Sequence, residues 1–182
     1  MYYTNSMKVT LKNEKTAAAA LENLKVRLHG GFGFEKNYRR NPSMLMHDRL
    51  EVVENTIVLP EDTGCYLPED AEKAIPELMQ YLAEHLRTET FTFSTCNNSE
   101  YDESWVNGSY ANGELKIKST YLPSGFTPFF CLECDEVIAT MTDDEEGNIH
   151  IEGEASICPE CGEEIDMSDW LPIISETTIK VA

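Results

Sequence analysis

The sequence predicts an α+β fold, in which a small mixed body of two helices and a β-meander is followed by a C-terminal module built on paired cysteines. Two segments carry apolar residues at helical spacing, and a later stretch alternates apolar and polar residues as strands do. The chain has 182 residues, of which 41% are hydrophobic, enough for one core and a small appendage. No apolar run approaches the length of a transmembrane span, so we expect no membrane association.

The first part of the body is predicted to hold a strand followed by a helix. Residues Met1–Ser6 are expected to form a short disordered leader, and Met7–Lys12 alternates as a strand does. Residues Glu14–Leu28 carry apolar side chains at helical spacing, and Asn13 is a candidate N-cap. A glycine-rich stretch after this helix lacks the Gly-Lys-Ser/Thr ending of a phosphate-binding loop, and we expect it to be an ordinary loop.

Two further strands and a second helix are predicted next. Leu50–Val53 and Thr56–Leu59 have strand character and flank a short turn. Pro68 begins a segment whose apolar residues recur at helical spacing as far as about Arg87. Because Pro76 lies inside this segment, the helix is expected to kink or restart there.

A β-meander completes the predicted body. Phe91 and Phe93 alternate with threonines in one strand. Ser104–Tyr110 and Leu115–Tyr121 are two more strands, joined by Asn112-Gly113. This dipeptide favours the positive φ angles of a type I′ turn and is the strongest short-range hairpin signal.

Four cysteines near the C-terminus form two Cys-x-x-Cys pairs, Cys131/Cys134 and Cys158/Cys161. Four thiolates delivered by two turns suit the tetrahedral preference of Zn²⁺, with one ion per chain and no open position for catalysis. Disulfides and redox motifs are the alternatives. Disulfides need an oxidising compartment, and no signal peptide is visible. A thioredoxin-like redox motif would be one pair that opens a helix after a strand, not two pairs that flank a hairpin. We therefore expect a structural zinc site and a cytoplasmic protein. Cys65 and Cys96 lie far away in the sequence, and we expect both to be buried free thiols.

The cysteine pattern and the residues around it resemble a zinc ribbon. The resemblance covers about Phe129–Ile165, with expected strands at Glu136–Met141 and Asn148–Glu152 and a left-handed Gly162 after the second pair. The expected organisation is a leader (1–6), an α+β body (7–125), a zinc ribbon (129–166) and a C-terminal tail (167–182) that packs back on the body.

Charge is the second strong feature, because the formal net charge is −19. Residues 1–60 carry a net charge of +3 and residues 61–182 carry −22. From Phe129 to Trp170 there are 14 acidic residues and no lysine or arginine. This field repels phosphate, so the ribbon is not expected to bind free DNA and should face a basic partner or solvent. Six acidic residues are candidates for the partner surface: Asp143, Asp144, Glu145, Glu146, Glu152 and Glu154.

Solubility alone can explain an acidic surface. However, a rigid acidic frame can also occupy the basic groove of a protein that handles nucleic acid. In length and charge the chain is similar to the anti-CRISPR proteins of phages and mobile elements, which inhibit type II RNA-guided nucleases. The most specific motif in this chain is the set of two Cys-x-x-Cys pairs, and that motif is typical of zinc ribbons in general. The resemblance implies a guide-RNA-loaded nuclease as partner, engaged where arginine and lysine side chains contact DNA.

A basic segment offers an alternative function. Lys36, Arg39 and Arg40 lie among aromatic residues and could contact single-stranded nucleic acid or another subunit. In that case the chain would be a zinc-ribbon adaptor or a transcription-related factor. A homodimer, in which this segment meets the acidic surface of a second copy, is a further expectation. An enzyme is not expected, because neither the histidines nor Cys96 belong to a catalytic pattern.

Overall fold

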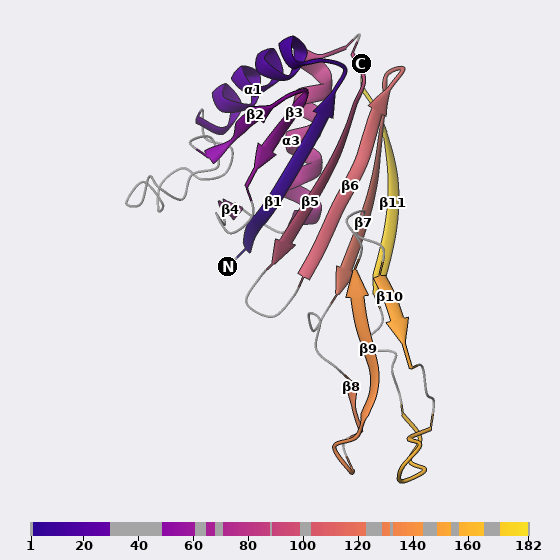
Figure 1. The fold of residues 1–182 in the computed structure, drawn as a ribbon. Helices are drawn as coiled ribbons and strands as arrows, with labels where there is room; N and C mark the ends of the chain where they lie inside the picture. Colours follow the sequence, from indigo (N-terminus) through magenta and orange to yellow (C-terminus); the bar gives the residue numbers. More distant parts are fainter. Residues whose placement is uncertain are drawn as a thin grey trace.

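One large antiparallel sheet organises the molecule (Figure 1). A computed structural model describes residues 2–29, 49–60, 65–67, 71–87, 89–98, 103–122, 129–131, 133–143, 149–153, 157–165 and 172–181. The elements are β1 (Tyr2–Leu11), α1 (Glu14–His29), β2 (Glu51–Val53), β3 (Thr56–Leu59), β4 (Cys65–Leu67), α3 (Ala71–His85), β5 (Phe91–Asn98), β6 (Glu103–Ala111), β7 (Glu114–Leu122), β8 (Phe129–Phe130), β9 (Val137–Asp143), β10 (Ile149–Glu152) and β11 (Ile173–Lys180).

Eight of these strands form the main sheet, in the order β11-β7-β6-β5-β1-β3-β2, with β4 also pairing with β1. The three remaining strands form a small sheet in the order β10-β9-β8. Helices α1 and α3 cover one face of the main sheet, and the small sheet projects beyond one end of it (Figure 1). The predicted α+β fold is therefore confirmed.

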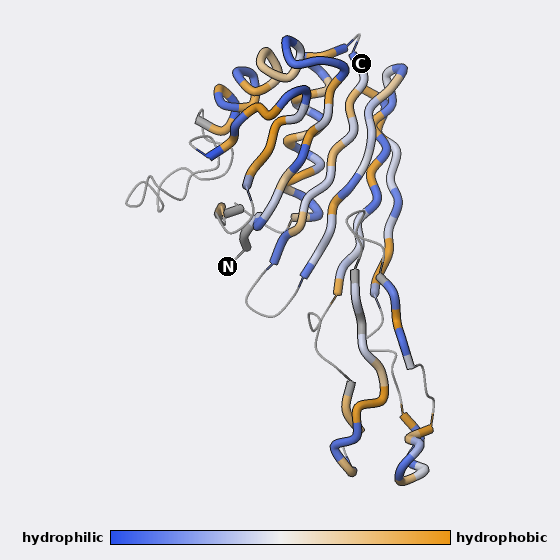
Figure 2. The backbone as a smooth tube through the Cα atoms, viewed as in Figure 1, coloured by the Kyte–Doolittle hydropathy of each residue, from blue (hydrophilic) through white to orange (hydrophobic). Residues whose placement is uncertain are grey.

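The core lies between the two helices and the sheet. Along β5 the buried residues alternate with more exposed ones, so that Phe91 and Phe93 face the helices. Figure 2 shows the same alternation of hydrophobic and hydrophilic residues along the strands of the sheet. The largest fully buried side chains of this cluster include Met7, Leu24, Ile57, Leu59, Ile75, Leu78, Met79, Leu82, Tyr110 and Leu115.

Helix α1 begins where the sequence predicts, with Asn13 as its N-cap. The side-chain Oδ1 of Asn13 accepts hydrogen bonds from the backbone amide of Thr16, at 2.9 Å, and from the Thr16 hydroxyl, at 3.1 Å. One amide that has no partner inside the helix is thereby satisfied.

Replacing Asn13 by alanine is expected to lower the free energy of unfolding by about 1 kcal/mol, because the Thr16 amide loses its acceptor. Urea denaturation followed by circular dichroism measures this change. Asn13→Asp keeps an acceptor at the same place and is the matched control. Equal stability of the alanine and aspartate variants would contradict the capping role.

Helix α3 continues through Pro76 rather than restarting there. The β6–β7 hairpin turns at Asn112 (φ 52°) and Gly113 (φ 79°), as the Asn-Gly signal predicts. A similar short turn at Glu54 (φ 55°) joins β2 to β3.

The expected disordered leader at Met1–Ser6 is wrong, because β1 already begins at Tyr2. This part of β1 pairs with β4 on one side and with β5 on the other. Thr4 is fully buried, and its hydroxyl donates a hydrogen bond to Oδ1 of Asn97 at 3.0 Å. Polar residues are held here by partners distant in sequence, so no local hydrophobic pattern indicated the strand.

Candidate metal centre

Each Cys-x-x-Cys pair lies in a tight turn, and the two turns have the same backbone hydrogen bonds. In the first turn, the Cys131 amide donates to the carbonyl of Glu136 at 2.8 Å, and the Asp135 amide donates to the carbonyl of Cys131 at 2.9 Å. In the second, the Cys158 amide donates to the carbonyl of Glu163 and the Gly162 amide to that of Cys158, at 2.8 and 2.9 Å. The two turns therefore present their cysteines in equivalent ways.

The residue after each pair adopts the left-handed conformation, with φ of 58° at Asp135 and 77° at Gly162. The expectation for Gly162 is thus confirmed. Glycine enters this region without steric cost, and aspartate tolerates it better than most side chains. The left-handed residue allows the chain to reverse direction directly after each pair.

Short strand pairings flank both turns. Phe130, which precedes the first turn, pairs with Val137, which follows it. Ile157 and Glu164 form an isolated β-bridge across the second turn. The first pairing belongs to β8 and β9, which continue into the small sheet. Each cysteine pair is therefore fixed at the end of a hydrogen-bonded hairpin.

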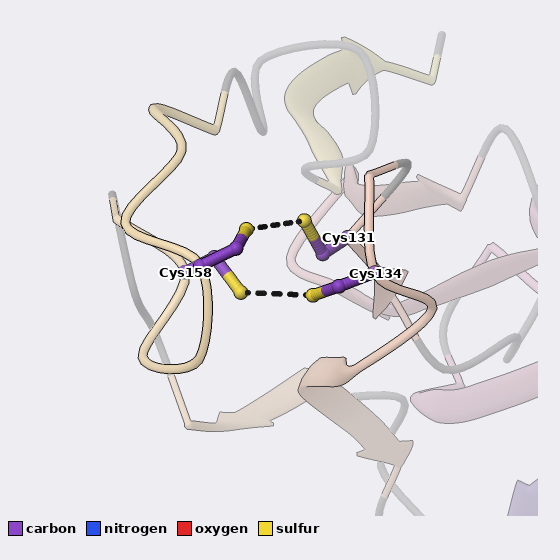
Figure 3. Close-up of side chains that lie close together, drawn as sticks. Cys131, Cys134 and Cys158 are labelled. Atoms are coloured by element: carbon purple, nitrogen blue, oxygen red, sulfur yellow. Dashed lines mark hydrogen bonds between the residues drawn. The ribbon is translucent and has the colours of Figure 1, made fainter.

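The four sulfur atoms come together from both turns (Figure 3). Sγ of Cys131 lies 3.5 Å from Sγ of Cys161, and Sγ of Cys134 lies 3.5 Å from Sγ of Cys158. All four sulfurs lie within 4.8 Å of one another. A disulfide bond is about 2.05 Å long, so neither close contact is a disulfide. The set is one that could hold a metal ion.

The backbone and the neighbouring thiols shift the acidities of this cluster. Backbone amides of Cys161 and Glu160 donate to the sulfur of Cys158 and lower the pKa of this thiol to about 7. The amide of Glu136 also lowers the pKa of Cys134, but burial and the surrounding thiols outweigh it and raise that pKa to about 12. If all four thiols were deprotonated, the anionic sulfurs would repel one another at these distances, and a bound cation would relieve that repulsion.

The small sheet packs on the main sheet through a second apolar cluster. Trp105 of β6 and Leu122 of β7 belong to the same buried cluster as Ile138, Ala139 and the cysteines Cys131 and Cys158. Cys96, Ile151 and Ile165 pack against its margin. The cysteine-bearing module is therefore docked on the sheet, a contact that the sequence did not indicate. One sequence feature could have indicated this contact, namely the alternation of residues along β6, which places Trp105 on the face away from the helices.

The other candidate residues fall in different places. Cys65 is buried in the main core, and burial raises its pKa to about 11 although Arg49 lowers it in part. Glu152 is exposed at the end of β10, and Asp143 ends β9. Asp144, Glu145, Glu146, Glu154, Lys36, Arg39 and Arg40 lie outside the described residues.

A shallow hollow of about 240 Å³ lies where β6, β7 and β11 adjoin. Its lining includes Ser109, Lys116, Lys118, Glu176 and Thr178, but no cysteine or histidine.

Comparisons with known proteins add no relative: no protein-family model, no curated protein and no solved structure matches the chain. Within the described part of the chain, neither helix combines the length and the apolar character that crossing a bilayer requires.

Proposed function

We propose that this protein is an acidic binding protein, without catalytic activity, whose partner-binding module is stabilised by one structural Zn²⁺. The observation that carries the proposal is the four-cysteine cluster, which lies in a segment from Phe129 to Trp170 with 14 acidic residues and no lysine or arginine. The zinc organises the module, and the exposed carboxylates around it bind a basic protein.

The sulfur positions support zinc as the ion. Zinc binds thiolate sulfur at about 2.3 Å, which places the sulfurs of a tetrahedral site about 3.8 Å apart. The sulfurs observed here, 3.5 to 4.8 Å apart, need only a small adjustment to reach that arrangement. Four cysteines leave no coordination position for water or substrate, so the ion would hold the fold and perform no chemistry.

The surface around the cysteines supports a protein partner. Six carboxylates in the two turns are exposed: Glu133, Asp135, Glu136, Glu160, Glu163 and Glu164. Among them lie large apolar side chains with high exposure, since Phe130 is 51%, Val137 44% and Ile157 55% exposed. Apolar anchors within a charged rim are typical of protein–protein interfaces. The complementary partner would offer an apolar contact surrounded by lysine and arginine.

Proteins that bind nucleic acid have grooves lined with lysine and arginine, which contact the phosphates. A rigid set of carboxylates in that groove would exclude DNA, and the attraction would weaken as salt screens it. Among these proteins we propose a type II CRISPR nuclease loaded with guide RNA as the partner. The chain would then inhibit DNA binding or cleavage by occupying the surface that contacts DNA.

The direct experiment measures binding of target DNA by a guide-loaded type II nuclease, with and without this protein, at two salt concentrations. Inhibition that weakens at the higher salt is the expected result. Absence of inhibition at both salt concentrations would overturn this choice of partner. Binding of free DNA by the protein itself would favour the adaptor function instead, because an acidic mimic should bind none.

Neutralising the acidic loop of the ribbon is expected to weaken partner binding while the fold stays intact. The variant changes Asp143 and Asp144 to asparagine and Glu145 and Glu146 to glutamine. Loss of four charges should weaken inhibition about tenfold at low salt, since each exposed ion pair contributes up to about 1 kcal/mol. Binding of target DNA by the guide-loaded nuclease, measured with increasing amounts of the wild-type protein or of the variant, reports this change.

The matched control removes four charges from the body, at the exposed residues Glu14, Glu22, Glu51 and Glu54. If binding depended only on net charge, the two variants would weaken inhibition equally. Unchanged inhibition by the loop variant at every salt concentration would exclude this loop from the interface.

A further inference from the structure

The last strand of the main sheet has an outer edge that no described residue covers. Strand β11 forms one end of the sheet and pairs with β7 over its whole length without a register shift (Figure 1). Residues 173–178 are exposed on both faces of the strand. Ile173 and Ile174, which point to opposite faces, are 59% and 58% exposed. The inner strands of the sheet have a paired strand on each side, whereas β11 has one on a single side.

Exposed edge strands usually have a feature that prevents pairing with another chain. Common protective features are a proline, a β-bulge, a covering helix or several lysines. Strand β11, with the sequence IISETTIK, has no proline and a single lysine. It also runs in continuous register with β7, from Ile173 opposite Tyr121 to Lys180 opposite Glu114. Its edge is therefore competent to accept a further strand.

The direction of the backbone groups on β11 follows from one hydrogen bond. The Val181 amide donates to the carbonyl of Gly113 at 2.9 Å, so residue 181 faces the β7 side. Because the hydrogen-bonding direction alternates along an antiparallel strand, the odd-numbered residues of β11 face β7. The even-numbered residues Glu176, Thr178 and Lys180 consequently direct their backbone groups to the outer edge.

We propose that a second copy of this chain pairs with this edge, β11 against β11, in antiparallel orientation around a two-fold axis at Thr178. In this register Thr178 lies opposite its own counterpart, and Glu176 of each copy lies opposite Lys180 of the other. All three residues direct their backbone groups to the outer edge, so the directly opposed residues exchange backbone hydrogen bonds. A two-fold axis repeats each contact, giving two Glu–Lys pairs.

Charge selects this register over its neighbours. A shift that centres the axis on Glu176 would place two carboxylates directly opposite each other, which is unfavourable. A shift that centres it on Thr177 would place Glu176 opposite Thr178 and Ile174 opposite Lys180, without any ion pair. Only the axis at Thr178 opposes unlike charges twice and pairs threonine with threonine, a favourable cross-strand pair.

Charge also favours a second copy over a basic peptide as the occupant. The strand contributes one glutamate and one lysine, so the edge itself is neutral in a chain of net charge −19. Repulsion between whole copies is screened beyond a Debye length of about 8 Å at physiological ionic strength, whereas the opposed pairs lie in contact. The edge is therefore complementary to itself and not to a strongly basic segment.

The test is the oligomeric state of the full chain, prepared with zinc, by sedimentation velocity from micromolar to submillimolar concentration at physiological salt. The wild-type protein is expected to dimerise reversibly. Glu176→Lys places lysine opposite lysine and Lys180→Glu places glutamate opposite glutamate, so each variant alone should dimerise about tenfold more weakly. An equimolar mixture of the two variants restores both unlike pairs and should form a heterodimer with nearly wild-type affinity.

Lys8→Glu makes the same charge change at an exposed position of β1 and should leave dimerisation unchanged. Circular dichroism melting curves show whether each variant is folded. A wild-type chain that stays monomeric at all concentrations would overturn the proposal. Dimers that persist equally in both single variants, or a mixture of the variants that does not recover, would also overturn it, since the contact would then lie elsewhere. This proposal does not depend on zinc or on the identity of the acidic surface's partner.

Discussion

The double variant Cys158→Ser/Cys161→Ser should lose its metal and unfold the module formed by β8, β9 and β10. Apparent binding free energies of structural zinc reach about 10–16 kcal/mol in small zinc domains, and that energy is folding energy because the site does not exist in the unfolded chain. Metal analysis should fall from one zinc ion per chain to none. Hydrogen exchange should show loss of protection along β9, while β5 and β6 stay protected by the separate main core.

Removal of the other two thiols provides the matched control for this experiment. In Cys65→Ala/Cys96→Ala the number of thiols falls by the same amount, but neither residue belongs to the four-sulfur cluster. That variant should keep one zinc ion and the protection of β9. Retention of one ion per chain by the Cys158/Cys161 variant would refute the four-thiolate site.

Substitution of Gly108 by alanine should be among the most destabilising single changes in the body. A Cβ atom at this position would overlap the backbone carbonyl oxygen of Lys116 on β7 and would lie 2.8 Å from two ring atoms of Phe93. The carbonyl belongs to a paired strand and the buried ring to the core, so neither can move freely. We expect the free energy of unfolding to fall by about 3 kcal/mol, at the upper end for overpacking. Chemical denaturation measures it.

Gly113→Ala is the matched control, because it adds the same methyl group where there is room. The nearest atom to its Cβ is the Val181 carbonyl oxygen at 3.7 Å, so the cost arises only from the left-handed conformation, at φ 79°. That cost should be about 1 kcal/mol. The double variant Gly108→Ala/Phe93→Leu should recover part of the loss by removing the ring. A Gly108→Ala variant as stable as Gly113→Ala would contradict the steric argument.

The features that the sequence predicts correctly are those whose causes lie within a few residues. Asn13 caps the amide of a residue three positions later, and Asn112-Gly113 makes its turn from its own backbone preferences. The two cysteine turns likewise close through hydrogen bonds within six residues of the chain. For the same reason the cluster of four cysteines, which could hold a metal ion, and the left-handed Gly162 could be predicted without a structure.

The features that were missed depend on partners far along the chain. The first residues of β1 are held by β4 and β5, and β4 itself is a three-residue strand with no local signal. The pairing of β11 with β7, which makes β11 an edge strand, joins two segments that lie far apart in the sequence.

The sequence by itself determined the helices, the hairpin, the cysteine set and the excess of negative charge. Only the tertiary structure decided that the cysteine module docks on the sheet through Trp105 and Leu122, and that β11 ends the sheet with a neutral outer edge that none of the described residues covers. Turns and caps are fixed by local backbone chemistry, whereas strand neighbours and docked surfaces are chosen by burial between distant segments, which no short window of sequence records.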